Sequence, residues 1–170
     1  MGKLTFILIF IWINSSVLGQ DIVKSFIDKH GKDDNIEVIT IGKKMMETIY
    51  SLTSDNPDLT ETIKGLENIC IISSKDLELN KEYYDSARKM LAKSKGMKEL
   101  FSMSEGNKEL IIMIRESRNS IRELILLSEQ EDGFNLISIS GAIDLDVLLN
   151  YSEGLNIKEL EQLRSVKRNQ

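Results

Sequence analysis

Four strand-like segments follow one another closely in the second half of the chain, and this spacing limits the possible folds more than any other feature. The segments are residues 97–104, 108–116, 120–128 and 134–140. The turn-forming segments between them are residues 105–107, 117–119 and 130–133. Connections of this length join neighbouring antiparallel strands as hairpins. The sequence therefore predicts a four-stranded meander.

The first half of the chain alternates between helical and strand-like patterns. Apolar residues at helical spacing predict helices over residues 20–29, 43–52, 58–64 and 81–95. Apolar and β-branched runs predict strands over residues 36–41 and 68–72, the second either covered on both faces or central in a sheet. Asn80 is expected to cap the longest helix, and Asp144 to cap a final helix that runs to Tyr151.

This order of elements predicts an α+β domain of two layers. We expect a mixed, mainly antiparallel sheet of about six strands, with the helices largely on one face. The chain has 170 residues, of which 41% are hydrophobic and 29% are charged, and it contains a single Pro. This composition is typical of one soluble globular domain and excludes collagen-like, disordered and disulfide-framework proteins.

The first 19 residues have the layout of a secretory signal peptide. A positive start at Lys3 precedes an apolar run over residues 4–13 and a small, polar region that ends at Gly19. An apolar run of about ten residues is too short to cross a hydrocarbon core of about 30 Å as a helix, so a retained membrane anchor is the poorer interpretation. We expect cleavage near Gly19-Gln20, export to the periplasm or the exterior, and a single folded domain over residues 20–170.

Charge and cysteine content exclude several kinds of partner and anchor. The chain has 22 basic and 27 acidic residues, a net charge of −5, and loss of residues 1–19 would make it −6. A negative balance argues against nucleic acid and anionic membrane surfaces as partners. No Cys follows the expected cleavage region, so no lipid anchor is expected, and the lone Cys70 cannot form an internal disulfide. The basic end from residue 164 is expected to be a frayed tail.

His30 and Cys70 are the first candidates for chemistry. His30, the only histidine, has Asp28, Asp33 and Asp34 nearby in sequence, as a zinc site would need, but no second His or suitably spaced Cys. We expect a solvated His at the end of a helix. Cys70 with His30 as base could form a nucleophilic pair, but its apolar neighbours predict a buried, inert thiol.

The remaining motifs are also better explained by structure than by chemistry. Asp144 and Asp146 could divide acid and base roles, but their spacing at a helix start points them in different directions. Ser140 precedes Gly141 but lacks the upstream Gly of a nucleophile elbow, and the glycines form no phosphate cradle. The methionines outside residues 1–19 are expected to fill the core. The sequence therefore predicts no catalytic, metal-binding or cofactor-binding residues, and no cofactor.

Residues 134–146, FNLISISGAIDLD, resemble the closing signature of an exported Bacteroidota family known as domain of unknown function 4252. In that family a strand leads through a Gly into an acid-capped helix, and a hairpin like that at residues 121–127 precedes it. The resemblance extends across the chain after residue 19, with the strands and helices in the expected order. It implies a small exported α+β domain in the cell envelope or outside it. The family offers no catalytic residues to carry over, and its gene neighbourhoods imply a role in envelope regulation.

Three functions remain open at the level of the sequence. The leading hypothesis is a non-enzymatic exported domain that binds an envelope or extracellular protein or acts in envelope regulation. The first alternative is a carrier of a small ligand, indicated by the methionines and the loop at residues 51–57. The second is a hydrolase whose carboxylates converge in a way that sequence spacing does not reveal.

Overall fold

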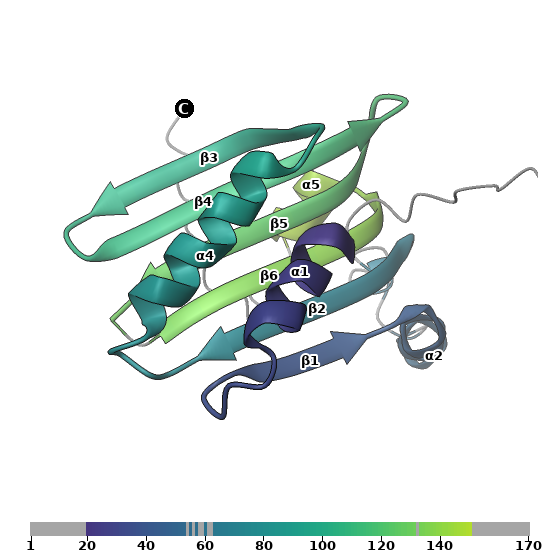
Figure 1. Cartoon of the computed structure of the whole chain (residues 1–170). Coiled ribbons are helices and arrows are strands. Elements are labelled where there is room, and N and C mark those ends of the chain that lie inside the picture. The colour runs from purple at the N-terminus through teal and green to yellow at the C-terminus, as the bar shows by residue number, and fades with distance from the viewer. Residues whose placement is uncertain are drawn as a thin grey trace, which may run out of the picture.

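A computed structural model describes residues 20–53, 55, 57, 60, 63–131 and 133–150 of the chain (Figure 1). The helices are α1 (Gln20–His30), α2 (Lys43–Leu52), α4 (Asn80–Lys93) and α5 (Leu145–Asn150). The strands are β1 (Glu37–Ile41), β2 (Leu66–Ser74), β3 (Met97–Glu105), β4 (Lys108–Ser117), β5 (Ser120–Gln130) and β6 (Gly133–Ile143). One open sheet holds all six strands, so the expected α+β fold is confirmed. The helix expected over residues 58–64 and the tail from residue 164 lie partly or wholly outside the described residues.

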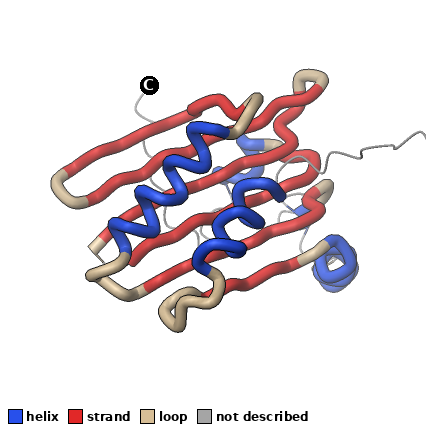
Figure 2. Tube along the Cα trace, in the orientation of Figure 1, coloured by secondary structure: helices blue, strands red, loops and turns tan. Residues whose placement is uncertain are grey.

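The strand order is β1-β2-β6-β5-β4-β3, and every pairing is antiparallel. The parallel pairing that a mixed sheet would contain does not occur among the described strands. β2 and β3 do run in the same direction, but β6, β5 and β4 lie between them. α4 makes this connection across one face of the sheet, from β2 to the far edge (Figure 2).

The meander forms as its short turns predict. Glu105 pairs with Lys108, and Gly106 has φ +60° at the first central position of the turn between β3 and β4. Arg118 and Asn119 have φ values of 52° and 60° in the turn between β4 and β5. Positive φ at turn residues lets a two-residue connection follow the twist of the strands it joins.

The start of α4 differs from the expectation. Leu79 occupies the cap position, and no side chain caps the helix. Asp76 instead accepts hydrogen bonds through Oδ1 from the backbone N–H groups of Glu78 and Leu79, at 3.0 and 3.2 Å. Asn80 is the first residue of the helix, and its side chain turns inward, 2% exposed. The prediction of Asn80 as a cap is wrong because the turn at Asp76 moves the helix start one residue earlier.

α1 and α4 pack together on one face of the sheet and bury the larger aromatic residues (Figure 1). We call this face the α4 face. Its buried residues are Ile22, Phe26, Cys70, Ile72, Tyr83, Tyr84, Ala87, Leu91, Ile111, Ile125, Leu127, Phe134 and Leu136. Two of the described helices thus lie on this face.

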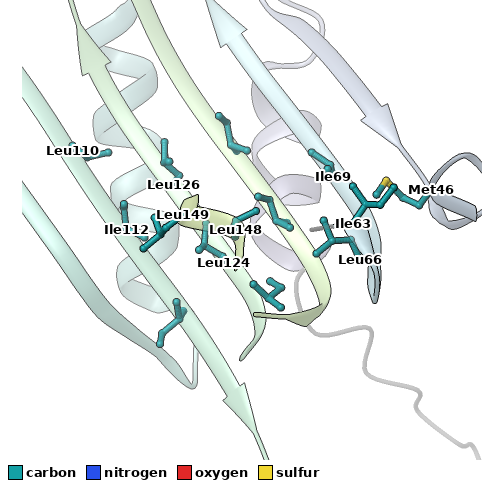
Figure 3. Packing of buried hydrophobic residues seen from close by; sticks show 14 residues of the cluster. Met46, Ile63, Leu66, Ile69, Leu110, Ile112, Leu124, Leu126, Leu148 and Leu149 are labelled. Carbon is teal, nitrogen blue, oxygen red and sulfur yellow. The ribbon is translucent and has the colours of Figure 1, made fainter. Parts of the chain in front are cut away.

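The opposite face of the sheet is also covered. Leu148 and Leu149 of α5 lie over Ile112 and Leu124, while Met46 of α2 packs near β2 (Figure 3). The other buried residues on this face are Ile63, Leu66, Ile69, Leu110, Ile114, Leu126, Ile137, Ile139 and Ile143. Side chains of a strand alternate between faces, so the continuous apolar runs in β2, β4 and β5 supply both cores. Helices therefore cover both faces of the sheet, whereas the sequence predicted them largely on one face.

One ion pair is buried on the α4 face. Arg115 Nε donates to Glu123 Oε2 at 2.9 Å, and the Glu123 side chain is fully buried. The Arg115 guanidinium also donates to the backbone carbonyl of Lys95 and, at 3.1 Å, to Ser94 Oγ. A buried charge is tolerated only when it is paired and hydrogen-bonded. The pair therefore fastens the end of α4 to the sheet just before β3 begins.

The backbone just before β2 lies close to the backbone of β6 at Gly65 and Gly141. Gly141 has φ +133°, and a Cβ atom at this position would overlap the carbonyl oxygen of Gly65. The neighbouring Ala142 N–H donates to that same oxygen at 2.8 Å, where β2 has an irregular register between Leu66 and Asn68. Only glycine combines this φ value with this contact.

We expect Gly141→Ala to lower the free energy of unfolding by about 3 kcal/mol, from backbone strain and overpacking. Gly42→Ala is the matched control, since Gly42 has φ −85° and no atom lies within 4 Å of a Cβ built there. It should cost less than about 1 kcal/mol. Urea unfolding followed by circular dichroism measures both. Equal stability of the two variants would contradict the close contact.

Candidate functional site

His30, which the sequence places at the solvated end of a helix, is 5% exposed. It does end α1, as expected, but its ring packs against Phe26 and Tyr83, with centroid distances of 4.8 and 5.1 Å. The prediction of a solvated side chain is wrong, because α4 packs over the end of α1. Nothing in the local sequence indicates that contact, since His30 and Tyr83 are far apart along the chain.

His30 joins a chain of hydrogen bonds between α1 and α4. Its Nδ1 lies 3.2 Å from Asp33 Oδ2, and its Nε2 lies 2.9 Å from Ser86 Oγ. Lys29 Nζ donates to the same Ser86 Oγ at 2.9 Å. Because a carboxylate only accepts, the proton of a neutral His30 is assigned to Nδ1, and Ser86 then donates to Nε2. Both ring nitrogens of His30 and the hydroxyl of Ser86 therefore have hydrogen-bond partners.

The order Ser86, His30, Asp33 matches the order of side chains in an acyl-transfer triad. Such a triad also needs N–H donors aimed at a developing oxyanion. Ser86 lies inside α4, where the described backbone N–H groups around it belong to the helical ladder. Lys29 already donates to its Oγ. The arrangement therefore joins α1 to α4, and the described backbone N–H groups around Ser86 are occupied by the helix.

An open hollow of about 600 Å³ lies beside Ser86. Its lining residues are Lys29, Lys81, Glu82, Asp85, Ser86, Lys89, Met90 and Lys93. The lysines outnumber the acids, and the hollow lies over the helices rather than between helix and sheet. This differs from the apolar pocket that a small-ligand carrier would require.

Cys70 is buried in β2, as expected. Burial raises the pKa of its thiol, and a hydrogen bond from Thr40 Oγ1, 3.6 Å from Sγ, partly offsets this. A thiol that stays protonated is a poor nucleophile. The hydrogen-bond partners of His30 are Asp33 and Ser86, so the hypothetical Cys70–His30 pair is not formed.

Asp144 caps α5 as predicted. Its Oδ1 accepts from the N–H groups of Asp146 and Val147 at 3.0 and 3.1 Å, and Asp146 lies in the first turn. Asp28 and Asp34 are exposed. In the described part of the chain, no group of three or more His, Cys, Asp or Glu side chains is arranged to hold a metal ion. No described helix is long and apolar enough to cross a membrane.

The methionines behave largely as the sequence predicts. Met46 is buried, and Met90, Met97, Met103 and Met113 pack against the two cores. Met45 is the exception, since it is exposed on α2.

Met45 is one of the exposed apolar residues of β1 and α2, which together we call the β1–α2 edge. It comprises Val38, Ile39, Met45, Tyr50 and Leu52, of which Ile39 is 54% and Leu52 is 78% exposed. β1 is an edge strand, so one side of its backbone has no neighbouring strand within the described sheet. The sequence signal for this surface is the uncharged run between Glu37 and Lys43. A search for functional motifs does not detect such a run.

We expect the Cys70 thiol to react slowly with a disulfide reagent such as DTNB in the folded protein. Burial blocks access of the reagent to Sγ and also raises the pKa of the Cys70 thiol. At pH 8.5 a smaller fraction of Cys70 than of glutathione should therefore be thiolate. Reaction rates measured across a urea series should rise together with unfolding. Complete labelling of the folded protein at the rate of glutathione would show that Cys70 is accessible.

We expect Ser86→Ala to lower the free energy of unfolding by about 1–3 kcal/mol, since His30 Nε2 and Lys29 Nζ both lose a buried or half-buried partner. Ser25→Ala, at an exposed position of α1, should change it by less than about 0.5 kcal/mol. Thermal unfolding of both variants measures the difference. Equal effects would mean that the hydrogen-bond chain contributes little.

The match to a known protein family covers the whole sheet. A family model described as a domain of unknown function (DUF4252) matches residues 29–151, a segment that contains all six strands. No curated protein and no solved structure matches the chain. The chain belongs to this domain-of-unknown-function family.

Proposed function

We propose that the chain is an exported, non-enzymatic domain that binds a protein partner by adding a strand of that partner to β1, and that it acts in envelope regulation. Export is supported by the signal-like layout of residues 1–19, with cleavage near Gly19-Gln20. Binding is supported by the β1–α2 edge, the observation that carries the proposal.

The two edges of the sheet differ in how they resist pairing with another strand. β3 carries Lys98, Glu99 and Glu105, charges of the kind that discourage edge-to-edge association. β1 carries only Glu37, followed by four residues without charge, and Val38 and Ile39 are exposed on opposite faces. An unprotected edge strand is a template for strand addition.

The charges that flank β1 indicate the chemistry of the added strand. Glu37 lies at one end of β1, and the exposed Lys43 and Lys44 follow its other end. A complementary strand would have two consecutive apolar residues opposite Val38 and Ile39, a basic residue near Glu37 and an acidic residue near the lysines. α2 lies at the end of β1 (Figure 1), and its exposed Met45, Tyr50 and Leu52 add apolar area there.

A carboxylate-based hydrolase is the second candidate. Glu109 and Glu129 pair across β4 and β5, and burial, Asp85 and Glu109 raise the pKa of Glu129. A carboxyl group whose pKa is raised can act as the acid beside a second carboxylate. Release of nitrophenol from nitrophenyl glycosides by the parent protein, lost in Glu129→Gln, would favour this alternative.

We expect Ile39→Lys to abolish partner binding, since it places a charge on the unprotected edge. Leu100→Lys, at an exposed position of β3, is the matched control and should keep it. Tagged parent and variant proteins are used to capture binding proteins from envelope extract, and hydrogen exchange of the purified complex locates the contact. The amides of β1 should gain protection.

Loss of capture in Leu100→Lys but not in Ile39→Lys would place the interface on the other edge. Recovery of a tightly held metabolite without any protein would contradict the proposed function. Both substitutions are at the surface, so each should change stability by only about 0.5 kcal/mol, which circular dichroism checks.

A further inference from the structure

Glu109 and Glu129 lie opposite each other on the α4 face. Each is two residues along its strand from the buried pair Ile111 and Leu127. Residues directly opposite each other in an antiparallel pair have Cβ atoms about 4.5–5.5 Å apart, and like charges there are destabilising. Both side chains are half-buried and line an open hollow of about 630 Å³ at the start of α4. Another group must therefore offset the repulsion between these two carboxylates.

Buried polar groups of α4 face the same region. Asn80 lines the hollow, and neither its Nδ2 nor its Oδ1 has a hydrogen-bond partner among the described residues. One turn later, the Tyr84 hydroxyl is likewise buried without such a partner. A buried polar group left unpaired costs about 1–3 kcal/mol. Asn80 does not cap the helix either, so its role within the chain alone is unexplained.

The charges around the pair leave an excess of negative charge. Ser104 Oγ donates to Glu109 Oε1 at 2.7 Å, and Lys81 stabilises the charged form of Glu129. Asp85 lies near enough to Glu129 for the two negative charges to interact. Farther out, Glu131 pairs with Lys108 at 3.7 Å, and Glu78 also lines the hollow. The charge balance therefore favours a cation.

We propose that this hollow binds a hard divalent cation such as Ca²⁺, with the carboxylates of Glu109 and Glu129 and the amide oxygen of Asn80 as ligands. All three donors are oxygens, the ligand type that Ca²⁺ takes, and water completes its shell of six to eight. With two carboxylates rather than three, the site binds in the range of about 10⁻⁴–10⁻³ M that is typical of extracellular calcium modules. The bound ion separates the opposed charges and gives the Asn80 oxygen a partner.

Terbium luminescence tests this site, because Tb³⁺ occupies Ca²⁺ sites and a nearby tyrosine sensitises its emission. Excitation at the tyrosine band should give Tb³⁺ emission through Tyr84, and millimolar Ca²⁺ should displace it. Glu109→Gln and Glu129→Gln should each weaken binding about tenfold or more. Glu47→Gln, an exposed residue of α2 with the same charge change, should leave it unaltered.

Thermal unfolding gives a second readout that does not depend on emission. Ca²⁺ should raise the midpoint of the parent protein and of Glu47→Gln, but not of Glu129→Gln. Without Ca²⁺, Glu129→Gln should be at least as stable as the parent, because one of two opposed charges is gone. Absence of Tb³⁺ emission together with no effect of 10 mM Ca²⁺ on the midpoint, or equal binding by all variants, would overturn the proposal.

Discussion

The pairing of β2 with β6 is the constraint on which the rest of the structure depends. It joins the first half of the chain to the meander, in a register that places Ile69 opposite Ile139 and Ile71 opposite Ile137. Three glycines permit it: Gly65 and Gly141 at one end, and Gly133, where a Cβ atom would overlap the carbonyl oxygen of Ser74, at the other. A shift of one residue would turn every buried side chain of β6 to the wrong face.

That pairing also fixes which surfaces stay open. With β6 beside β2, β1 and β3 become the two edges, and both faces of the central strands are buried. α4 spans the sheet between β2 and β3, and its two ends reach different polar groups. Its beginning lies over Glu109 and Glu129, while its end is held by Arg115 and Glu123. The unprotected β1 edge and the acidic hollow are consequences of topology as much as of composition.

Local patterns predicted most of the elements well, because the forces that form them act over a few residues. The helix at α2, the four meander strands and the Asp144 cap follow from apolar spacing, turn residues and side-chain capping. The same reasoning failed at His30 and Asn80, which it placed at a solvated helix end and at a helix cap. His30 is buried by Tyr83 and Ser86 of α4, far away in sequence, and no local pattern encodes such contacts. At Asn80 the hydrogen bonds of the turn at Asp76 move the helix start one residue earlier.

The sequence alone determined the fold class, the order of the elements, the burial of Cys70 and the uncharged run over residues 38–42. These depend on residue type and short-range spacing. Only the tertiary structure decided that β6 enters beside β2, that helices lie on both faces, and that Ser86 meets His30. It alone placed Glu109 opposite Glu129, next to Asn80. The physical reason is that strand order and register follow from the simultaneous burial of two faces, a condition that no single segment contains.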